Sequence, residues 1–315
     1  MRYSSTRNFG FGRRPGFAAR NALRQLYGVG RYQTRATLAC RIDAFIEFLA
    51  TKGIRDFVAV DQNHVLAYAA YLKERVAAGQ LQTATAVNRL SAVNRVLSFM
   101  RARRDLVVSP RALIGRRRYV RTVPPVGLDA ARIDALAAEL ENDGHPQVGC
   151  AARLCRVIGL RFREASLLTL PRAFRTAVER GWCDIREGTK GGRGRRIRRR
   201  VEAGPEVVAV LAACLPLASA SGRLVPDGMT FAQWNQYAHR VYRRAAARAG
   251  LSTCFRDLRA AYACAVYASI TGSAAPAVAG VRTAPPAVDE AARMAVAQRL
   301  GHGRPQVTSA YCGGK

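Results

Sequence analysis

Residues 181–203, GWCDIREGTKGGRGRRIRRRVEA, decide the fold class of this chain. Two extended runs flank a glycine-rich turn, which is the pattern of a β-hairpin. Elsewhere apolar residues recur at helical spacing, and no other segment makes a convincing strand. The chain is therefore predicted to be mainly α, with one small antiparallel β-hairpin.

The region before the hairpin is predicted to begin with a small all-helical domain at residues 16–104. Apolar residues such as Ile42, Phe45 and Leu49 fall on one face of a helix. Asp61 is suited to cap the next helix, because its carboxylate can accept from free backbone N–H groups. The same spacing continues through a third long helix, so this domain needs no strand.

The rest of the chain is divided by changes in composition. Residues 1–15 form a basic, glycine-rich arm, expected to contact nucleic acid, although a disordered solvated tail would have the same composition. Residues 105–127 lose the helical periodicity and hold three prolines around a basic run, which predicts an interdomain linker. Residues 128–315 are predicted to form an α+β domain that contains the hairpin. Its segment 269–286, rich in Ala, Gly and Pro, is expected to be a loop between helices.

The charge of the chain indicates a polyanionic partner. There are 51 Lys plus Arg against 21 Asp plus Glu, a formal charge of +30. Such a field concentrates phosphate backbones and makes binding salt-dependent. No basic amphipathic helix with a bulky aromatic face stands out, and no long apolar run or secretory signal is seen, so we expect a cytoplasmic protein without a membrane partner.

The eight cysteines show no CxxC pair and no histidine at metal-ligand spacing. They are expected to be reduced thiols scattered through helices. No metal site and no cofactor are therefore predicted.

Four segments of the second domain resemble, in order and spacing, the motifs of the tyrosine recombinase or phage integrase family. The last is the most specific, because it combines LGH with a tyrosine nine residues after the histidine. The resemblance is closest to integrases of proteobacterial prophages and integrative elements. The segments are GLRFREASLLTL (159–170), GTKGGRGRRI (188–197), RDLRAAY (256–262) and LGHGRPQVTSAY (300–311).

The resemblance implies that Arg161 and Arg259 grip the scissile phosphate and that Tyr311 is the nucleophile. Two forked guanidiniums suit the charge that builds on the phosphoryl oxygens during in-line attack. A tyrosine exchanges one phosphate ester for another, so a different DNA 5′ hydroxyl can reverse the step without ATP.

Other positions take supporting roles by the same resemblance. Lys190, the one lysine between positions 74 and 314, would protonate the leaving 5′ oxygen. His302 would hydrogen-bond a non-bridging phosphate oxygen, and Glu164 would hold its helix or orient Arg161. The family usually has a histidine where this chain has Arg256, which can hold phosphate but cannot accept the tyrosine's proton. The group that removes this proton is left open.

The resemblance also implies partners. The helical domain would be the family's SAM-like core-binding domain, and the chain would act as a homotetramer on double-stranded DNA attachment sites, with an accessory DNA-bending protein in some systems. Only four residues follow the tyrosine, so we expect protomers to be linked otherwise than by a long exchanged C-terminal helix. DNA contacts are expected from basic residues of the arm, the linker and the hairpin: Arg13, Arg14, Arg116, Arg117, Arg118, Arg195 and Arg196.

Three functions remain to be compared. The first is an integrase that integrates or excises a mobile element through a 3′-phosphotyrosyl intermediate, located with the nucleoid. The second is a catalytically impaired recombinase-fold regulator or accessory protein, for which Arg256 is the sole support. The third is an RNA-binding protein, which would predict RRM or KH motifs that the sequence lacks.

Overall fold

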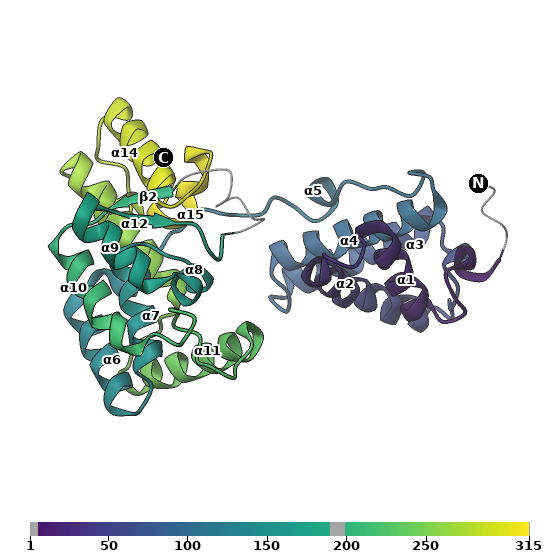
Figure 1. Ribbon diagram of the computed structural model, residues 1–315. Helices are drawn as coiled ribbons and strands as arrows, with labels where there is room; N and C mark the ends of the chain where they lie inside the picture. The colour runs from purple at the N-terminus through teal and green to yellow at the C-terminus, as the bar shows by residue number, and fades with distance from the viewer. Residues whose placement is uncertain (1–5, 190–198, 315) are drawn as a thin grey trace. The chain divides into compact units, whose positions relative to one another are not determined.

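The computed structural model describes residues 6–189 and 199–314, and the chain divides into two compact units, Met1–Arg118 and Tyr119–Lys315. Each unit has its own hydrophobic core. The boundary lies inside the predicted linker. Helices dominate both units, and the described residues contain a single two-stranded antiparallel sheet, which confirms the predicted fold class (Figure 1).

Unit 1 is all-helical. Its core includes Ile42, Phe45 and Leu49, the apolar face expected from their spacing. Asp61 caps a helix as predicted, because its side chain accepts a hydrogen bond from the His64 N–H at 3.0 Å. The elements are η1 (Arg7–Gly10), α1 (Pro15–Tyr27), α2 (Tyr32–Thr51), η2 (Phe57–Ala59), α3 (Gln62–Ala77), α4 (Thr83–Arg101) and α5 (Pro110–Leu113).

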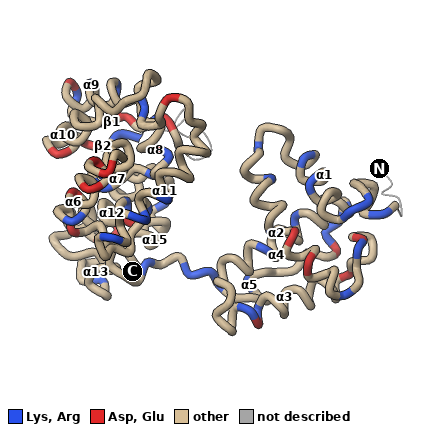
Figure 2. The backbone as a smooth tube through the Cα atoms, turned by 90° about the horizontal axis from the view of Figure 1, so that it is seen from below, with Lys and Arg blue, Asp and Glu red and all other residues tan. Residues whose placement is uncertain are grey.

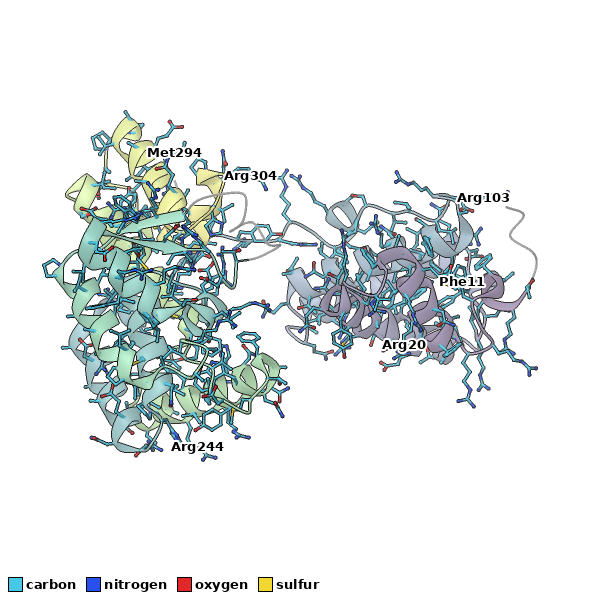
Figure 3. All side chains as sticks on the ribbon, viewed as in Figure 1. Phe11, Arg20, Arg103, Arg244, Met294 and Arg304 are labelled. Atoms are coloured by element: carbon cyan, nitrogen blue, oxygen red, sulfur yellow. The ribbon has the colours of Figure 1, made fainter. Side chains whose placement is uncertain are left out.

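Part of the predicted N-terminal arm is packed into unit 1. Asn8 is fully buried, and its side chain donates to the carbonyls of Gly12 and Arg13 at 2.8 and 3.0 Å. The side-chain oxygen of Asn8, Oδ1, accepts a hydrogen bond from the Phe57 N–H at 2.9 Å. Phe11 is buried nearby in the core of this unit (Figure 3). Residues 7–14 are therefore fastened to η2 and α1.

Both ends of the predicted linker are packed as well. On the N-terminal side, the Asn94 side chain bonds both backbone groups of Val108, at 2.7 and 3.3 Å. On the C-terminal side, the Gly127 N–H donates to Asp257 at 3.1 Å. A side chain at Gly127 would lie 2.8 Å from Leu258, so glycine permits this close approach.

Unit 2 is built around two helices, α7 and α12, that pack against each other and are buried over most of their length. Alanines of α12, among them Ala260, Ala261 and Ala263, keep its surface narrow and allow neighbours to approach closely. The helices are η3 (Val126–Leu128), α6 (Ala130–Asn142), α7 (Pro146–Val157), α8 (Phe162–Leu167), α9 (Leu170–Arg180), α10 (Pro205–Cys214), η5 (Leu215–Leu217), α11 (Phe231–Arg248), α12 (Phe255–Thr271), α13 (Pro276–Ala279), α14 (Pro286–Arg299), η6 (Pro305–Thr308) and α15 (Ser309–Cys312).

The sheet of unit 2 pairs β1 (Trp182–Ile185) with β2 (Arg199–Glu202) in antiparallel register, Trp182 opposite Glu202 and Ile185 opposite Arg199. These are the two extended runs expected from the sequence. The turn that would join them, residues 190–198, lies outside the described residues.

The segment 269–286, expected to be a loop, is more ordered than its composition indicates. Helix α12 continues to Thr271, and the four-residue helix α13 follows before α14 begins at Pro286. Pro276 and Ala277 of α13 are buried, so tertiary packing outweighs the weak helix propensity of this segment. Among the described residues, no helix has the length and apolar character needed to cross a membrane.

Candidate active site

The end of α14 and the elements after it bring the predicted histidine and tyrosine together. Gly301 has a φ of +67°, a left-handed conformation that glycine adopts without strain, and it turns the chain after the helix. The His302 N–H then donates back to the Ala297 carbonyl at 2.7 Å. Elements η6 and α15 return the chain, so that the Tyr311 hydroxyl lies 3.4 Å from His302 Nε2.

Arg259 joins this pair from α12. Its side chain is 1% exposed, and the guanidinium carbon lies 5.6 Å from the centroid of the Tyr311 ring. Nη1 donates to the Gly159 carbonyl, and Nη2 donates to the Leu300 carbonyl at 2.6 Å. Nε has no hydrogen-bond partner within the described part of the chain. Arg259 therefore fixes two motif segments against each other and keeps one donor free.

Glu164 of α8 is fully buried and joins three arginines. Its carboxylate accepts from the Arg161 side chain and, at 2.8 Å, from the Arg161 N–H. It also accepts from Arg199 Nη1 at 2.7 Å and from Arg259 Nη1 at 3.3 Å. Burial opposes ionisation of Glu164, but the three guanidiniums outweigh it and hold its pKa below the ordinary value. Glu164 thus positions both predicted phosphate-binding arginines.

The cluster carries net positive charge, since three guanidiniums surround one carboxylate. Burial, reinforced by Arg259 and Arg161, lowers the pKa of His302 to about 4. Burial, with Arg199 and Arg161, lowers the pKa of Arg259 to about 10. At neutral pH, Arg259 is therefore charged and His302 is a neutral imidazole.

Arg199 is a member of this cluster that the sequence did not single out. Strand β2 alternates, with Arg199 and Val201 buried and Arg200 and Glu202 exposed. The two-residue period of a strand was the available signal. It was hidden because arginine occupies five of the six positions 195–200, where alternation leaves no contrast in residue type.

A second buried ion pair holds the chain that carries Tyr311. Arg293 and Asp289 of α14 pair at 2.9 Å, and the Tyr267 hydroxyl donates to Asp289 at 2.7 Å. Arg293 also donates to the carbonyls of Gly313 and Gly314, at 3.1 and 2.6 Å. Composition gave no indication of this network, because Tyr267, Gly313 and Gly314 lie 20 or more residues from the Asp289–Arg293 pair.

All eight cysteines are free thiols. The thiol of Cys264, on α12, donates to the Tyr311 carbonyl at 3.6 Å and so contacts the backbone of the predicted nucleophile. Within residues 6–189 and 199–314, no group of three or more His, Cys, Asp or Glu side chains is placed to hold a metal ion.

The other predicted contacts lie elsewhere. Arg256 is exposed in the first turn of α12, three residues before Arg259. Arg304, which the sequence did not single out, is also exposed, two residues after His302 (Figure 3). In unit 1, Arg13, Arg14, Arg116 and Arg118 are exposed and Arg117 is half-buried, and basic residues follow the chain after α5 (Figure 2). Lys190, Arg195 and Arg196 lie outside the described residues.

Comparison with known proteins gives a partial family match and a fold. Residues 115–265 match the family model described as Integrase. The structure is similar to a lambda integrase dimer bound to a COC′ core site, with a TM-score of 0.58 and 15% identity, covering 93% of this chain and 75% of that one. A lambda integrase tetramer bound to a Holliday junction matches with a TM-score of 0.57 and 16% identity, over 92% of this chain and 74% of that one. No curated protein sequence matches the chain.

Proposed function

We propose that this chain is a tyrosine recombinase that cleaves and rejoins DNA at specific sites through a covalent bond between Tyr311 and a 3′ phosphate, which the integrase match of residues 115–265 and the fold support. One observation carries the proposal. The Tyr311 hydroxyl lies 3.4 Å from His302 Nε2, and the buried Arg259 guanidinium contacts the same ring. These residues come from two motifs about 40 positions apart that the fold brings together.

The arginines supply the electrostatic part of catalysis. Arg161 is 29% exposed and can turn toward a DNA phosphate, whereas Arg259 is held by carbonyls and offers its free Nε–H. As Tyr311 attacks, negative charge builds on the non-bridging oxygens of the phosphate. The guanidinium of Arg259, already held in place, and that of Arg161, once turned toward the phosphate, stabilise this charge.

His302 is the group best placed to take the proton of Tyr311. Its imidazole is neutral at working pH because burial and the neighbouring arginines lower its pKa to about 4. A neutral Nε2 can accept a proton across the contact with the tyrosine hydroxyl. The Tyr311 oxygen then bonds to phosphorus, the bond from phosphorus to the 5′ oxygen breaks, and Lys190 protonates that oxygen. A 5′ hydroxyl reverses these steps during rejoining.

The assembly follows from the same reaction. The related lambda integrase forms a tetramer on a Holliday junction, and we infer that four copies of this chain exchange strands between two duplexes. The substrates would be attachment sites of a mobile element, with an accessory DNA-bending protein where a site requires it. The +30 charge supports binding to such long duplexes.

A trapping experiment tests the covalent step. Sites are selected from randomised duplexes by binding, and a nicked suicide substrate is made from the selected sequence. The parent should form a protein–DNA complex that survives denaturation. Tyr311→Phe should bind the DNA as tightly as the parent but form no covalent complex. The control Tyr237→Phe, which removes a hydroxyl bonded to His145, should form the covalent complex as the parent does.

Two outcomes contradict the proposal in different ways. Trapping that persists in Tyr311→Phe would show that another residue is the nucleophile. A parent that binds its selected site specifically but never forms the covalent complex would be the catalytically impaired DNA-binding protein.

A further inference from the structure

The side chain of Arg199 is the third guanidinium of the Glu164 cluster and is 4% exposed. It is the first residue of β2. Its neighbour Arg200 is exposed and lies over the Trp182 ring at 4.6 Å. A strand therefore places one arginine inside the cluster and the next one outside it.

Each nitrogen of Arg199 has a partner, and the three partners belong to two segments that are far apart in the sequence. Nη1 donates to Glu164 at 2.7 Å, and Nη2 donates to the Gly159 carbonyl at 3.2 Å, just before Arg161. Nε donates to the Arg299 carbonyl at 2.6 Å, three residues before His302. Only a planar guanidinium presents donors in this fork, since a lysine ammonium is a single point.

Arg199 and Arg259 share their acceptors. Both donate to the Gly159 carbonyl and to the same oxygen of Glu164. Arg199 is the closer of the two to that oxygen, at 2.7 Å against 3.3 Å. Arg199 is therefore the closer counterion of Glu164, and Arg259 is the more weakly bound of the two.

Gly301, the glycine of the LGH motif, packs closely against Arg199. A Cβ at Gly301 would lie 2.8 Å from Arg199 Cδ. The stem of Arg199 thus passes directly over the turn from which His302 extends. The turn and the arginine form one packed unit.

We propose that Arg199 is a positioning residue for strand cleavage, which bridges the start of α8 that carries Arg161 to the turn that carries His302. This inference rests on the proposed function. Arg199 acts in two separable ways. Its fork holds the two segments together, and its charge adds to the positive field around His302.

Two substitutions separate these actions. Arg199→Lys keeps the charge and loses the fork, and Arg199→Met loses both. Arg200→Lys and Arg200→Met change the adjacent, outward-facing residue in the same way and serve as controls. Cleavage is measured in a single turnover on the suicide substrate, alongside DNA affinity and thermal unfolding.

We expect Arg199→Lys to unfold cooperatively and to bind DNA like the parent, but to cleave about 10²-fold more slowly, as for a misplacement near 1 Å. The Arg200 variants should cleave within about twofold of the parent, as surface substitutions do. A 5′-bridging sulfur, which removes the need to protonate the leaving group, should not restore Arg199→Lys. Parent-like cleavage by Arg199→Lys, or full restoration by sulfur, would overturn the inference.

A second readout needs no cleavage. NMR titration of the ring protons of the four histidines, with His302 assigned through His302→Gln, reports the pKa of His302 in the free protein. The charges of Arg259, Arg161 and Arg199 lower this pKa, and the charge of Glu164 raises it. Arg199→Met should raise it, whereas Arg199→Lys and Arg200→Met should not. An unchanged pKa in a folded Arg199→Met would refute the inference even if the parent proved unable to cleave DNA.

Discussion

Replacing Glu164 by Gln should destabilise unit 2 strongly, although the two side chains have the same shape. The carboxylate is the shared counterion of Arg161, Arg199 and Arg259. Arg161 can turn into solvent, but Arg199 and Arg259 are 4% and 1% exposed and cannot. Removing one partner of such a buried pair costs about 3–5 kcal/mol. For a domain of this size, that loss lowers the unfolding midpoint by roughly 6–20 °C.

Tryptophan fluorescence provides the assay, because both tryptophans of the chain, Trp182 and Trp234, belong to unit 2. Urea unfolding at pH 7 gives the free energy of unfolding of the parent, Glu164→Gln and the control Glu202→Gln. Glu202 pairs with Arg299 at 3.2 Å but is 76% exposed, so its loss should cost under about 1 kcal/mol. A Glu164→Gln protein as stable as the control would refute the view that Glu164 neutralises the cluster.

The pH dependence of this difference has a definite sign. The folded-state pKa of Glu164 is depressed below its ordinary value of 4.5. The stability it contributes is therefore complete above that value and is lost as the pH falls through the lower folded-state pKa. The parent and Glu164→Gln should become more alike in stability on acidification below about pH 4.5.

Three further predictions concern residues proposed to be catalytic. Lys190→Arg should keep the DNA affinity of the parent and its salt dependence but cleave roughly 10²–10⁴-fold more slowly. A substrate with a 5′-bridging sulfur should restore the cleavage rate of this variant. Equal slowing on both substrates would instead make Lys190 a DNA contact. Arg256→Ala should cleave DNA roughly 10²–10³-fold more slowly than the parent, and Arg256→His should recover part of the rate. Unchanged single-turnover cleavage by Arg256→Ala would place this exposed residue outside the active site. Because the pKa of His302 is lowered from 6.5 to about 4, the unfolded chain binds more protons between these values, so stability should fall as the pH drops below 6.5. His302→Gln should reduce this loss of stability at acidic pH. If denaturant titrations show the same loss of stability in the parent and in His302→Gln, the lowered pKa of His302 would be contradicted.

The sequence allowed the mainly α fold, the hairpin and the capping role of Asp61 to be predicted, because each depends on residues close together in the chain. The motif spacing also identified Arg259, His302 and Tyr311, which the structure brings together. Their motif residues are distinctive in type, and two of them lie only nine positions apart.

Residues whose role depends on distant partners were not predictable in the same way. Arg199 is bonded to groups 35, 40 and 100 positions away, and nothing in a run of arginines indicates which one is buried. Asn8 is similar, since its side chain satisfies a backbone N–H 49 positions away, at Phe57. The local sequence pattern indicates whether a segment is a helix or a strand, but it does not indicate which other element will pack against that segment.

The anchoring of the chain end by Arg293 has a consequence for the kinetics of the proposed reaction. Gly313 lies so close to Ala277 that a Cβ there would approach the Ala277 nitrogen to within 2.4 Å. With its carbonyl also bound by Arg293 at 3.1 Å, the segment just after Tyr311 is ordered before any DNA arrives. Ordering a backbone costs roughly 1–2 kcal/mol per residue, and here that entropy is lost during folding rather than at the encounter with substrate. The proposed nucleophile thus needs no docking step of its own, so the rate of the proposed strand cleavage should not be gated by motion of the tyrosine segment.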